Sequence, residues 1–217
     1  MTLDFTPRQQ RFQSVAAQRQ SGLVLVLEDI GDPHNAGAIL RTCDAFGIQS
    51  VHFVFDQQPG FNPKKKASAT ATAVVKWLSI HTHDSTAAAL AFLKAQSYQM
   101  VATTLTDATP LYDTDWGHHP RLALWVGNEH RGLSHQAIQS ADFRVTIPMR
   151  GMAQSLNVSV TAALVMAEIT RQRVASGIPF DYDANAQQAL VASFDAIDAG
   201  EGTFSVPDRP FLGVFGS

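Results

Sequence analysis

The stretch LEDIGDPHNAGAILRTCDAFGI, residues 27–48, decides the fold. It begins where an apolar run of strand length from Leu23 to Leu27 ends. Asp32 and Pro33 then form a turn, Asn35 is a candidate N-cap, and a helix carrying Arg41 is expected over 36–46. At 100° per residue, Asn35 and Arg41 lie well apart around that helix. The stretch alone therefore fits either one shared site or a simple cap and a surface ion-pair former.

The same order of an apolar strand followed by a helix repeats along the chain. Strands are expected at 24–27, 51–55, 100–104, 122–126 and 144–147, and helices at 7–18, 36–46, 87–95, 134–140, 156–173 and 184–196. This alternation predicts an α/β fold with a mostly parallel sheet flanked by helices. Ligands of such folds bind beyond the carboxyl ends of the strands.

The composition is that of an ordinary globular protein, with 217 residues of which 45% are hydrophobic. The apolar runs are far too short to span a bilayer, and the polar start lacks the apolar core of a secretory signal, so no membrane association is expected. One cysteine, Cys43, permits no internal disulfide, which favours a cytoplasmic location. Cys43 lies about 200° around the helix from Arg41, so we expect a buried small side chain rather than a nucleophile.

The charge is unevenly distributed along the chain. Residues 178–217 contain six carboxylates and one arginine, a net charge of −5, so the rest of the chain carries +2 of the total of −3. Positive residues cluster at Arg8, Arg11 and Arg19 and at Lys64, Lys65 and Lys66. Such clusters can follow an RNA phosphate backbone, although the clusters alone favour a solvated surface.

Two further polar clusters follow predicted strands. After 122–126, Gly127 and Gly132 bracket a charged tetrapeptide that contains Glu129, and the two glycines allow a tight loop close to a ligand. The loop lacks G-x-G-x-x-G and a Walker lysine, so a dinucleotide or triphosphate site is not indicated. After 144–147, Ser155, Asn157 and Ser159 stand at the head of an apolar helix, where helix capping explains one of them but not all three.

Together, three segments resemble the three motifs of the SpoU branch of the SPOUT superfamily, the RNA ribose 2'-O-methyltransferases. They are DPHNAGAILRTCDAFG (32–47, motif one), LWVGNEHRGLS (124–134, motif two) and IPMRGMAQSLNVSVTAAL (147–164, motif three). The start, TPRQQRFQSVAAQRQ (6–20), is similar to the N-terminal extension of the TrmH-type tRNA (guanosine-2'-O)-methyltransferases. The resemblance divides the chain into an N-terminal helical extension at 1–20, a methyltransferase domain at 21–177 and an acidic appendage at 178–217.

The resemblance implies S-adenosylmethionine as cofactor, a C-terminal trefoil knot, a homodimer, and a ribose 2'-hydroxyl of RNA as substrate, with a D-loop guanosine of tRNA expected first. Another tRNA or rRNA nucleotide, or a non-catalytic RNA-binding protein with the same fold, are the alternatives. Carried over by motif position, the catalytic residues are Arg41, Asn35, Glu129, Ser155 and Asn157. The cofactor-binding residues are Thr103, Val126, Gly127, Ile147, Met149 and Leu156. The acidic tail differs from the basic tails of some tRNA-binding members.

Histidines and tryptophans give weaker signals. The pairs His81 with His83 and His118 with His119 lack a Cys or carboxylate framework, so surface histidines are expected and no metal site is predicted. Tryptophan rings can stack on bases, but Trp125 lies inside a predicted strand and is expected in the core.

Overall fold

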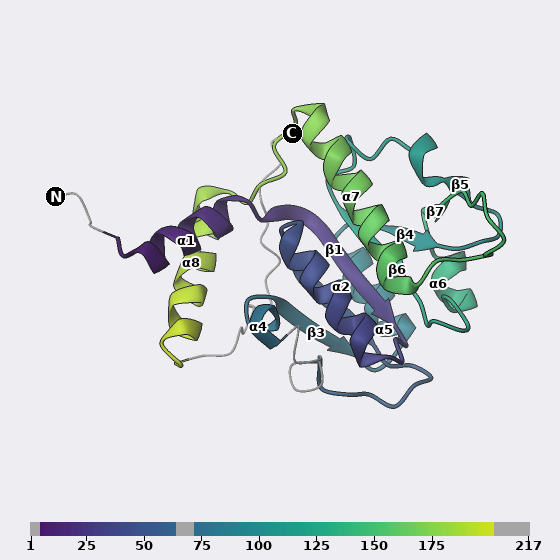
Figure 1. Ribbon diagram of the computed structural model, residues 1–217, viewed down its shortest axis with the longest axis horizontal. Coiled ribbons are helices and arrows are strands. Elements are labelled where there is room, and N and C mark those ends of the chain that lie inside the picture. Colours follow the sequence, from purple (N-terminus) through teal and green to yellow (C-terminus); the bar gives the residue numbers. More distant parts are fainter. Residues whose placement is uncertain (1–4, 64–71, 202–217) are drawn as a thin grey trace.

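The computed structural model describes residues 5–63 and 72–201, which form an α/β domain around one parallel sheet (Figure 1). In the described residues the sheet has seven strands in the order β3-β2-β1-β6-β4-β7-β5, and every neighbouring pair is parallel. The strands are β1 (Gln20–Glu28), β2 (Ile48–Val54), β3 (Ser79–His83), β4 (Gln99–Thr103), β5 (Thr109–Pro110), β6 (Leu122–Val126) and β7 (Phe143–Thr146). The helices are α1 (Pro7–Ala17), α2 (Pro33–Ala45), α4 (Thr72–Val75), α5 (Thr86–Ala95), α6 (His135–Gln139), α7 (Val158–Ser176) and α8 (Ala184–Asp198), with a 3-10 turn at Leu111–Asp113.

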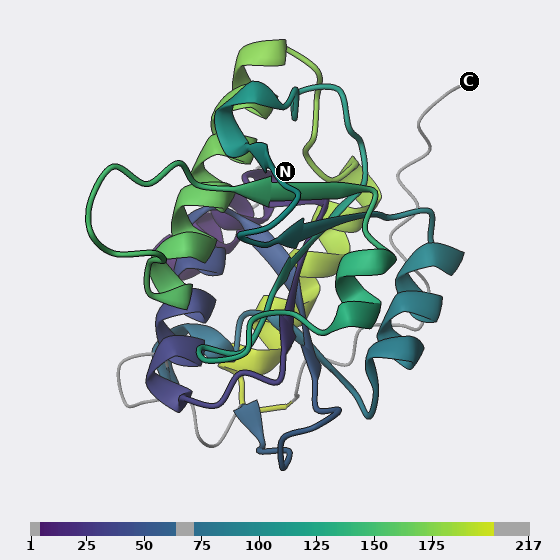
Figure 2. The ribbon, with the colours of Figure 1, turned by 90° about the vertical axis from the view of Figure 1, so that its right-hand side faces the viewer.

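Helices cover both faces of the sheet, and the alternation of β1 shows why. Leu23, Leu25 and Leu27 point to one face and pack in a core with side chains of α2 and α7. Val24 and Val26 point to the other face and pack with α5 and α6. Figure 2 shows the two layers on either side of the sheet. Because both faces are buried, β1 reads as a continuous apolar run.

The helices α1 and α8 lie side by side at one end of the domain (Figure 1). Their contact is a separate small core of Phe12, Ala16, Leu190 and Phe194, with Trp77 packed against it. The Arg8 guanidinium pairs with the Asp198 carboxylate at 2.6 Å and lies over the Phe12 ring. The two ends of the described chain therefore stabilise each other, although they are far apart in the sequence.

Helices α2 and α7 begin two or more residues away from their predicted starts. The N-cap of α2 is Asp32, whose carboxylate accepts from His34 N at 2.8 Å, and Asn35 lies inside the first turn. Helix α7 begins at Val158 with Asn157 as its N-cap, so Ser155 and Leu156 precede it. It ends at Gly177, whose φ of +69° is the left-handed conformation that glycine adopts without strain.

The prediction that Arg19 contributes to an RNA-binding surface is wrong. Its side chain is 1% exposed, and its guanidinium donates to the Asp44 carboxylate at 2.6 Å and to the Asp44 carbonyl at 3.2 Å. A buried arginine is held by such partners because an uncompensated charge in the interior is costly. Arg19 therefore ties the start of β1 to the end of α2.

Two of the three tryptophans, Trp116 and Trp125, lie in the core. Trp125 is 1% exposed within β6, as predicted, and Trp116 is fully buried with its indole N–H donating to the Leu111 carbonyl. Neither ring can stack on a base. Cys43 is fully buried, and burial raises the pKa of its thiol, which fits the predicted inert side chain. No helix among residues 5–63 and 72–201 has the length and apolar character to cross a bilayer.

The histidines of β3 are half-buried and belong to a stacked cluster at the sheet edge, where simple surface histidines were expected. His52 on β2 is 2% exposed, stacks on His81 with ring centroids 4.5 Å apart, and shares a 3.0 Å hydrogen bond with His83. Burial, together with repulsion from His81 and His83, holds the pKa of His52 well below 6.5. Burial also lowers the pKa of His83, against the opposing charge of Asp84. His52 and His83 are therefore neutral in the folded protein at pH 7.

This cluster predicts that acidification destabilises the fold. As the pH falls below 6.5, His52 takes up a proton in the unfolded chain but not in the folded one, so stability declines by up to about 1.4 kcal/mol per pH unit until its folded pKa is reached. Urea unfolding at pH 7.5 and 5.5 measures the loss. His52→Phe should flatten the pH dependence, whereas His135→Phe, at an exposed position on α6, should leave it unchanged. Equal slopes in His52→Phe and the wild type would contradict the assignment.

Candidate functional site

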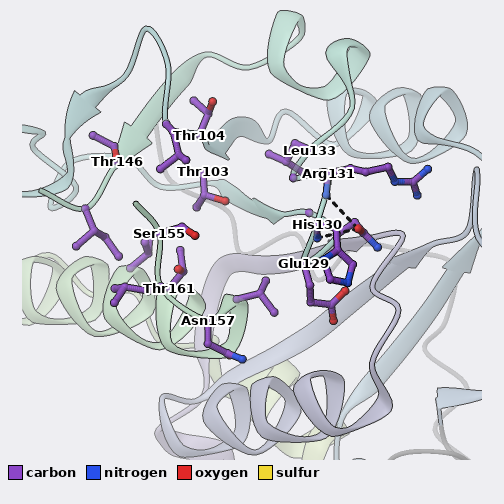
Figure 3. Close-up of a pocket in the computed structure, with 18 of the residues that line it drawn as sticks. Thr103, Thr104, Glu129, His130, Arg131, Leu133, Thr146, Ser155, Asn157 and Thr161 are labelled. Carbon is purple, nitrogen blue, oxygen red and sulfur yellow. Dashed lines mark hydrogen bonds between the residues drawn. The ribbon is translucent and has the colours of Figure 1, made fainter. Parts of the chain in front are cut away.

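A cavity of about 910 Å³ opens at the carboxyl ends of the central strands, where parallel α/β folds place their ligands. Its walls come from the segments that follow β1, β4, β6 and β7 and from the start of α7. Figure 3 shows Thr103, Glu129 and Asn157 reaching this cavity from three different elements. The three motifs thus meet at this cavity, although up to about a hundred residues separate them in the sequence.

Five of the six predicted cofactor-binding residues line this cavity. They are Thr103, Gly127, Ile147, Met149 and Leu156. Thr103 is fixed there by a hydrogen bond from its hydroxyl to the Trp125 carbonyl at 3.0 Å. Val126, by contrast, is 1% exposed within β6 and does not line the cavity. Its side chain packs in the core that β1 shares with α2 and α7, so its prediction as a neighbour of the ligand is corrected.

The motif-two loop is built around Asn128. Its side-chain amide donates to the Asp29 carbonyl at 2.9 Å, and its side-chain oxygen accepts from His130 N and Arg131 N at 3.0 and 3.1 Å. The backbones of Asn128 and Gly132 also exchange two hydrogen bonds, at 3.0 and 2.8 Å. This closes a tight turn that holds its backbone against the cavity. Sequence reasoning placed Asn128 in the cluster but gave it no role, because its contact with Asp29 spans 99 residues.

Glu129 links motif two to motif one. One carboxylate oxygen accepts from Gly31 N at 3.1 Å, and the other accepts from Asp32 N at 3.1 Å and from the Asn35 side-chain amide at 3.0 Å. The turn before α2 is therefore held by a carboxylate from another loop. This is a charge-assisted arrangement at a helix N-terminus, where negative charge is favourable.

The pKa of Glu129 reflects these contacts. Partial burial alone would raise the pKa of its carboxyl group, but the hydrogen bonds from Asn35 and from the backbone N–H groups of Gly31 and Asp32 outweigh burial, and the net pKa lies below the usual 4.5. The group is thus ionised at neutral pH and only accepts hydrogen bonds. Its contribution to stability is present above pH 4.5 and is lost only as the pH falls through the lower folded pKa.

The ionised Glu129 fixes the direction of a longer chain of hydrogen bonds. Because Asn35 donates to Glu129, its side-chain oxygen is left to accept from the Asn157 amide, at 3.1 Å. The Asn157 oxygen in turn accepts from the backbone N–H and the hydroxyl of Ser159, at 2.8 and 2.6 Å. Three of the predicted catalytic residues, Glu129, Asn35 and Asn157, are therefore directly connected at the rim of the cavity.

The other predicted site residues are not part of this series of hydrogen bonds. Ser155 lines the cavity and is exposed. Arg41 is exposed on α2 and does not line the cavity; among the described residues its guanidinium has no ion-pair or hydrogen-bond partner. Arg8 and Arg11 are exposed on α1, and Lys64, Lys65 and Lys66 lie outside the described residues. The predicted catalytic set thus consists of three connected residues and Ser155 at the cavity, and of Arg41 outside it.

Several lining residues were not predicted. Thr104, Thr106 and Thr146 at the ends of β4 and β7, together with Leu133 and Val165, complete the walls. Thr104 directly follows β4, Thr146 ends β7 and Thr106 lies in the loop after β4, so their position at the carboxyl edge is the signal that could have identified them. Apolar walls beside backbone groups and hydroxyls are typical of a small-molecule binding site.

The chain matches the family model described as the SpoU rRNA methylase family over residues 22–167. It is 40% identical over 172 residues to the tRNA (guanosine(18)-2'-O)-methyltransferase of Escherichia coli K12, a match that spans 79% of this chain and 72% of that protein.

Among solved structures, a TrmH/SpoU tRNA modifying enzyme of A. aeolicus superimposes with a TM-score of 0.76 at 30% identity, over 88% of this chain and 96% of that one. The SpoU methyltransferase AviRb of Streptomyces viridochromogenes, solved in complex with the cofactor AdoMet, superimposes with a TM-score of 0.62 at 26% identity, over 74% of this chain and 61% of that one. The likeness to the tRNA modifying enzyme extends over nearly the whole of both chains.

Proposed function

The chain belongs to the SpoU rRNA methylase family, and we propose from this that it methylates the ribose 2'-hydroxyl of a D-loop guanosine in tRNA with S-adenosylmethionine as methyl donor. The observation that carries this proposal is the chain Glu129–Asn35–Asn157 at the rim of the cavity. It joins all three family motifs at the one place where a methyl donor and a ribose could meet.

The residues that line the cavity fit S-adenosylmethionine. Ile147, Leu156 and Val165 provide apolar surface for the adenine ring, and Thr103 and the backbone of the motif-two loop provide polar groups for the ribose and the amino acid part. Gly127 allows the motif-two loop to close, because a side chain there would collide with the backbone of Gly132 and Leu133. When bound, the cofactor supplies an activated methyl group. The volume of about 910 Å³ is ample for a molecule of this size.

The side chains at the rim orient the ribose. In-line methyl transfer requires the hydroxyl oxygen to be held in one direction and its proton to leave. The amides of Asn35 and Asn157 are held in one orientation by Glu129, so they present fixed polar groups beside the cavity. The hydroxyl of Ser155, in the segment before α7, is near enough to the same cavity to contact the ribose. These residues position the hydroxyl, and the acceptor of its proton is not assigned to any of them.

Arg41 has a different role in this proposal. Guanidinium groups stay protonated in proteins, so Arg41 is a poor general base. Its exposed side chain, without a partner among the described residues, is available to bind the phosphate next to the target nucleotide and to stabilise the charge that develops on the ribose oxygen. Arg8, Arg11 and Lys64–Lys66 are proposed as further contacts to the tRNA backbone. Of these, the Arg8 guanidinium is already paired with Asp198, and Lys64–Lys66 lie outside the described residues.

A homodimer and a C-terminal trefoil knot belong to the same proposal. The dimer is supported by Val160 and Leu164, which are 45% and 37% exposed, four residues apart on one face of α7, and by the fully exposed Met152 in the preceding loop. The knot is supported by the extent of the likeness to the TrmH/SpoU enzyme. Sedimentation of the wild type and of Leu164→Glu tests the dimer: a wild-type monomer, or a variant that dimerises unchanged, would contradict it.

The proposed division of the chain is an extension at 1–20, a catalytic domain at 21–177 and an acidic appendage at 178–217. It is supported by the separate core that α1 and α8 share. A cytoplasmic location is proposed on the ground of the tRNA substrate.

Glu129→Gln is predicted to lower methyl transfer by about 100-fold, because a small misplacement of the orienting groups costs this much. A glutamine places an NH2 group against the N–H of Gly31, or against those of Asp32 and Asn35, where the carboxylate now accepts. Single-turnover rates measure the effect. Glu201→Gln, at an exposed position, is the matched control and should retain the wild-type rate. A wild-type rate in Glu129→Gln would remove the carboxylate from the mechanism.

The test of the function is methyl transfer from labelled S-adenosylmethionine to total tRNA and, separately, to rRNA, with the product located by nuclease digestion and mass spectrometry. We expect 2'-O-methylguanosine in the tRNA D-loop. Methylation of another nucleotide would support the proposed reaction but would show that the substrate is a different site. Tight tRNA binding without transfer to either RNA would favour the non-catalytic RNA-binding alternative.

A further inference from the structure

Glu28 is the last residue of β1, and its buried carboxylate joins the starts of α5 and α6. The residue is 1% exposed and does not line the cofactor cavity. One carboxylate oxygen accepts from the hydroxyl of Thr86, the first residue of α5, and from the Ser134 hydroxyl at 2.7 Å. The other oxygen accepts from Ser134 N, also at 2.7 Å. All three partners are donors, so the carboxylate acts only as an acceptor.

Ser134 is the residue through which Glu28 reaches the site. It is the N-cap of α6, where its hydroxyl accepts from Ala137 N at 3.1 Å. The preceding residue, Leu133, lines the cavity (Figure 3), and Leu133 N is among the backbone atoms that pack against Gly127. The Glu28 carboxylate therefore fixes the motif-two turn at the point where the chain leaves the cavity.

The two ends of the motif-two turn are held by adjacent residues at the end of one strand. The start of the turn is held by Asp29, whose carbonyl accepts from the Asn128 amide at 2.9 Å. The end of the turn is held by Glu28 through Ser134. The strand that carries both residues is paired with β2 and β6, so it is a firm support. A turn held at both ends keeps the backbone beside the cavity in one position, and a preorganised site of this kind binds its ligand more tightly.

We propose that Glu28 is a positioning residue of the cofactor site, which sets the affinity for S-adenosylmethionine by holding the end of the motif-two turn. This inference deepens the proposed function and rests on its placement of the cofactor in the cavity. Because Glu28 does not line the cavity, its effect on the ligand passes through Ser134. Its contact with Thr86 leads to α5, and among the described residues that line the cavity none belongs to α5. One contact of the carboxylate thus serves the site, and the other serves the fold alone.

The experiment measures the dissociation constant of S-adenosylhomocysteine, the molecule that the cofactor becomes after methyl transfer, by calorimetric titration. In Glu28→Gln an NH2 group replaces one acceptor oxygen, and we expect the affinity to fall about tenfold, because hydrogen bonds to a buried carboxylate are lost. Thr86→Val is the matched control. It removes only the contact with α5, with a side chain of nearly the same shape, and should retain the wild-type affinity. Thermal unfolding should show that both variants are less stable than the wild type but remain folded during the titration.

Hydrogen exchange provides a readout that is independent of ligand binding. The N–H groups of Asn128 and Gly132 each donate to the carbonyl of the other across the motif-two turn, at 3.0 and 2.8 Å. Their exchange should be faster in Glu28→Gln than in Thr86→Val, with the N–H groups of β6 as the measure of any global loss of stability. If Glu28→Gln does not fold, Ser134→Ala removes the hydroxyl contact from the other side, and Ser134→Thr restores it. We then expect weaker ligand binding in Ser134→Ala and recovery in Ser134→Thr.

Wild-type affinity in a folded Glu28→Gln, or in Ser134→Ala where Glu28→Gln does not fold, would overturn the proposal, because the turn would then hold its position without the carboxylate. An equal loss of affinity in Glu28→Gln and Thr86→Val would also overturn it, since ligand binding would then follow the stability of the fold. A wild type that does not bind S-adenosylhomocysteine would refute the proposed placement of the cofactor itself. The wild-type titration therefore separates a failure of the proposed function from a failure of the role given to Glu28.

Discussion

Replacing Arg41 with alanine is expected to lower kcat for methyl transfer by about 1,000-fold while the dissociation constant for S-adenosylmethionine changes less than about twofold. The rate and the cofactor affinity are expected to respond differently because of where Arg41 lies. Arg41 is exposed on α2 and does not line the cavity, so the cofactor has no contact to lose. The developing charge on the ribose oxygen and the adjoining phosphate would lose their cationic partner, which acts mainly in the transition state.

Single-turnover methylation of tRNA and calorimetric titration of S-adenosylhomocysteine measure the two quantities separately. Arg41→Lys is the informative companion, since it retains the charge without the planar fork. We expect it to recover part of the rate and to bind the ligand as the wild type does. Equal losses of rate and of ligand affinity in Arg41→Ala would refute the separation between a cofactor cavity and an external arginine.

Much of the fold was predictable because the buried strands are continuous apolar runs in the sequence. All five residues of β6 are apolar and at most 1% exposed, as expected of a central strand with both faces covered. The α/β class with its parallel sheet is confirmed. Strand β3 was missed because its sequence, SIHTH, is polar. Its histidines are half-buried only because they stack on His52, a contact no local pattern reveals.

The candidate site was predictable as three clusters but not as a connected structure. Resemblance to the motifs identified Glu129, Asn35 and Asn157, yet the hydrogen bonds between them span 94 and 122 residues. Arg19 was misjudged for the same reason, since its partner Asp44 is 25 residues away. The start of α2 did carry a readable signal. Proline favours the first helical position, so Pro33 indicates Asp32 and not Asn35 as the N-cap.

Gly127→Ala is expected to lower the affinity for S-adenosylmethionine by more than about 100-fold, the second large effect. A Cβ atom at Gly127 would lie 2.2 Å from the Gly132 carbonyl carbon, 2.3 Å from its oxygen and 2.3 Å from Leu133 N. All three are backbone atoms, so no rotation of a side chain relieves the overlap. The motif-two turn must open to accept even one methyl group. This opening also displaces the backbone that faces the cavity.

Gly151→Ala provides the matched control, because Gly151 lies in the motif-three loop and a Cβ there meets no atom within 4 Å. We expect this variant to bind S-adenosylhomocysteine with wild-type affinity, and thermal unfolding should show that both variants remain folded. Wild-type affinity in Gly127→Ala would mean that the turn moves without cost and that its closed form is not what the cofactor recognises. A comparable loss in Gly151→Ala would instead place the recognition in the motif-three loop. The contrast between two alanines in one site thus isolates the closed motif-two turn as the element that holds the cofactor.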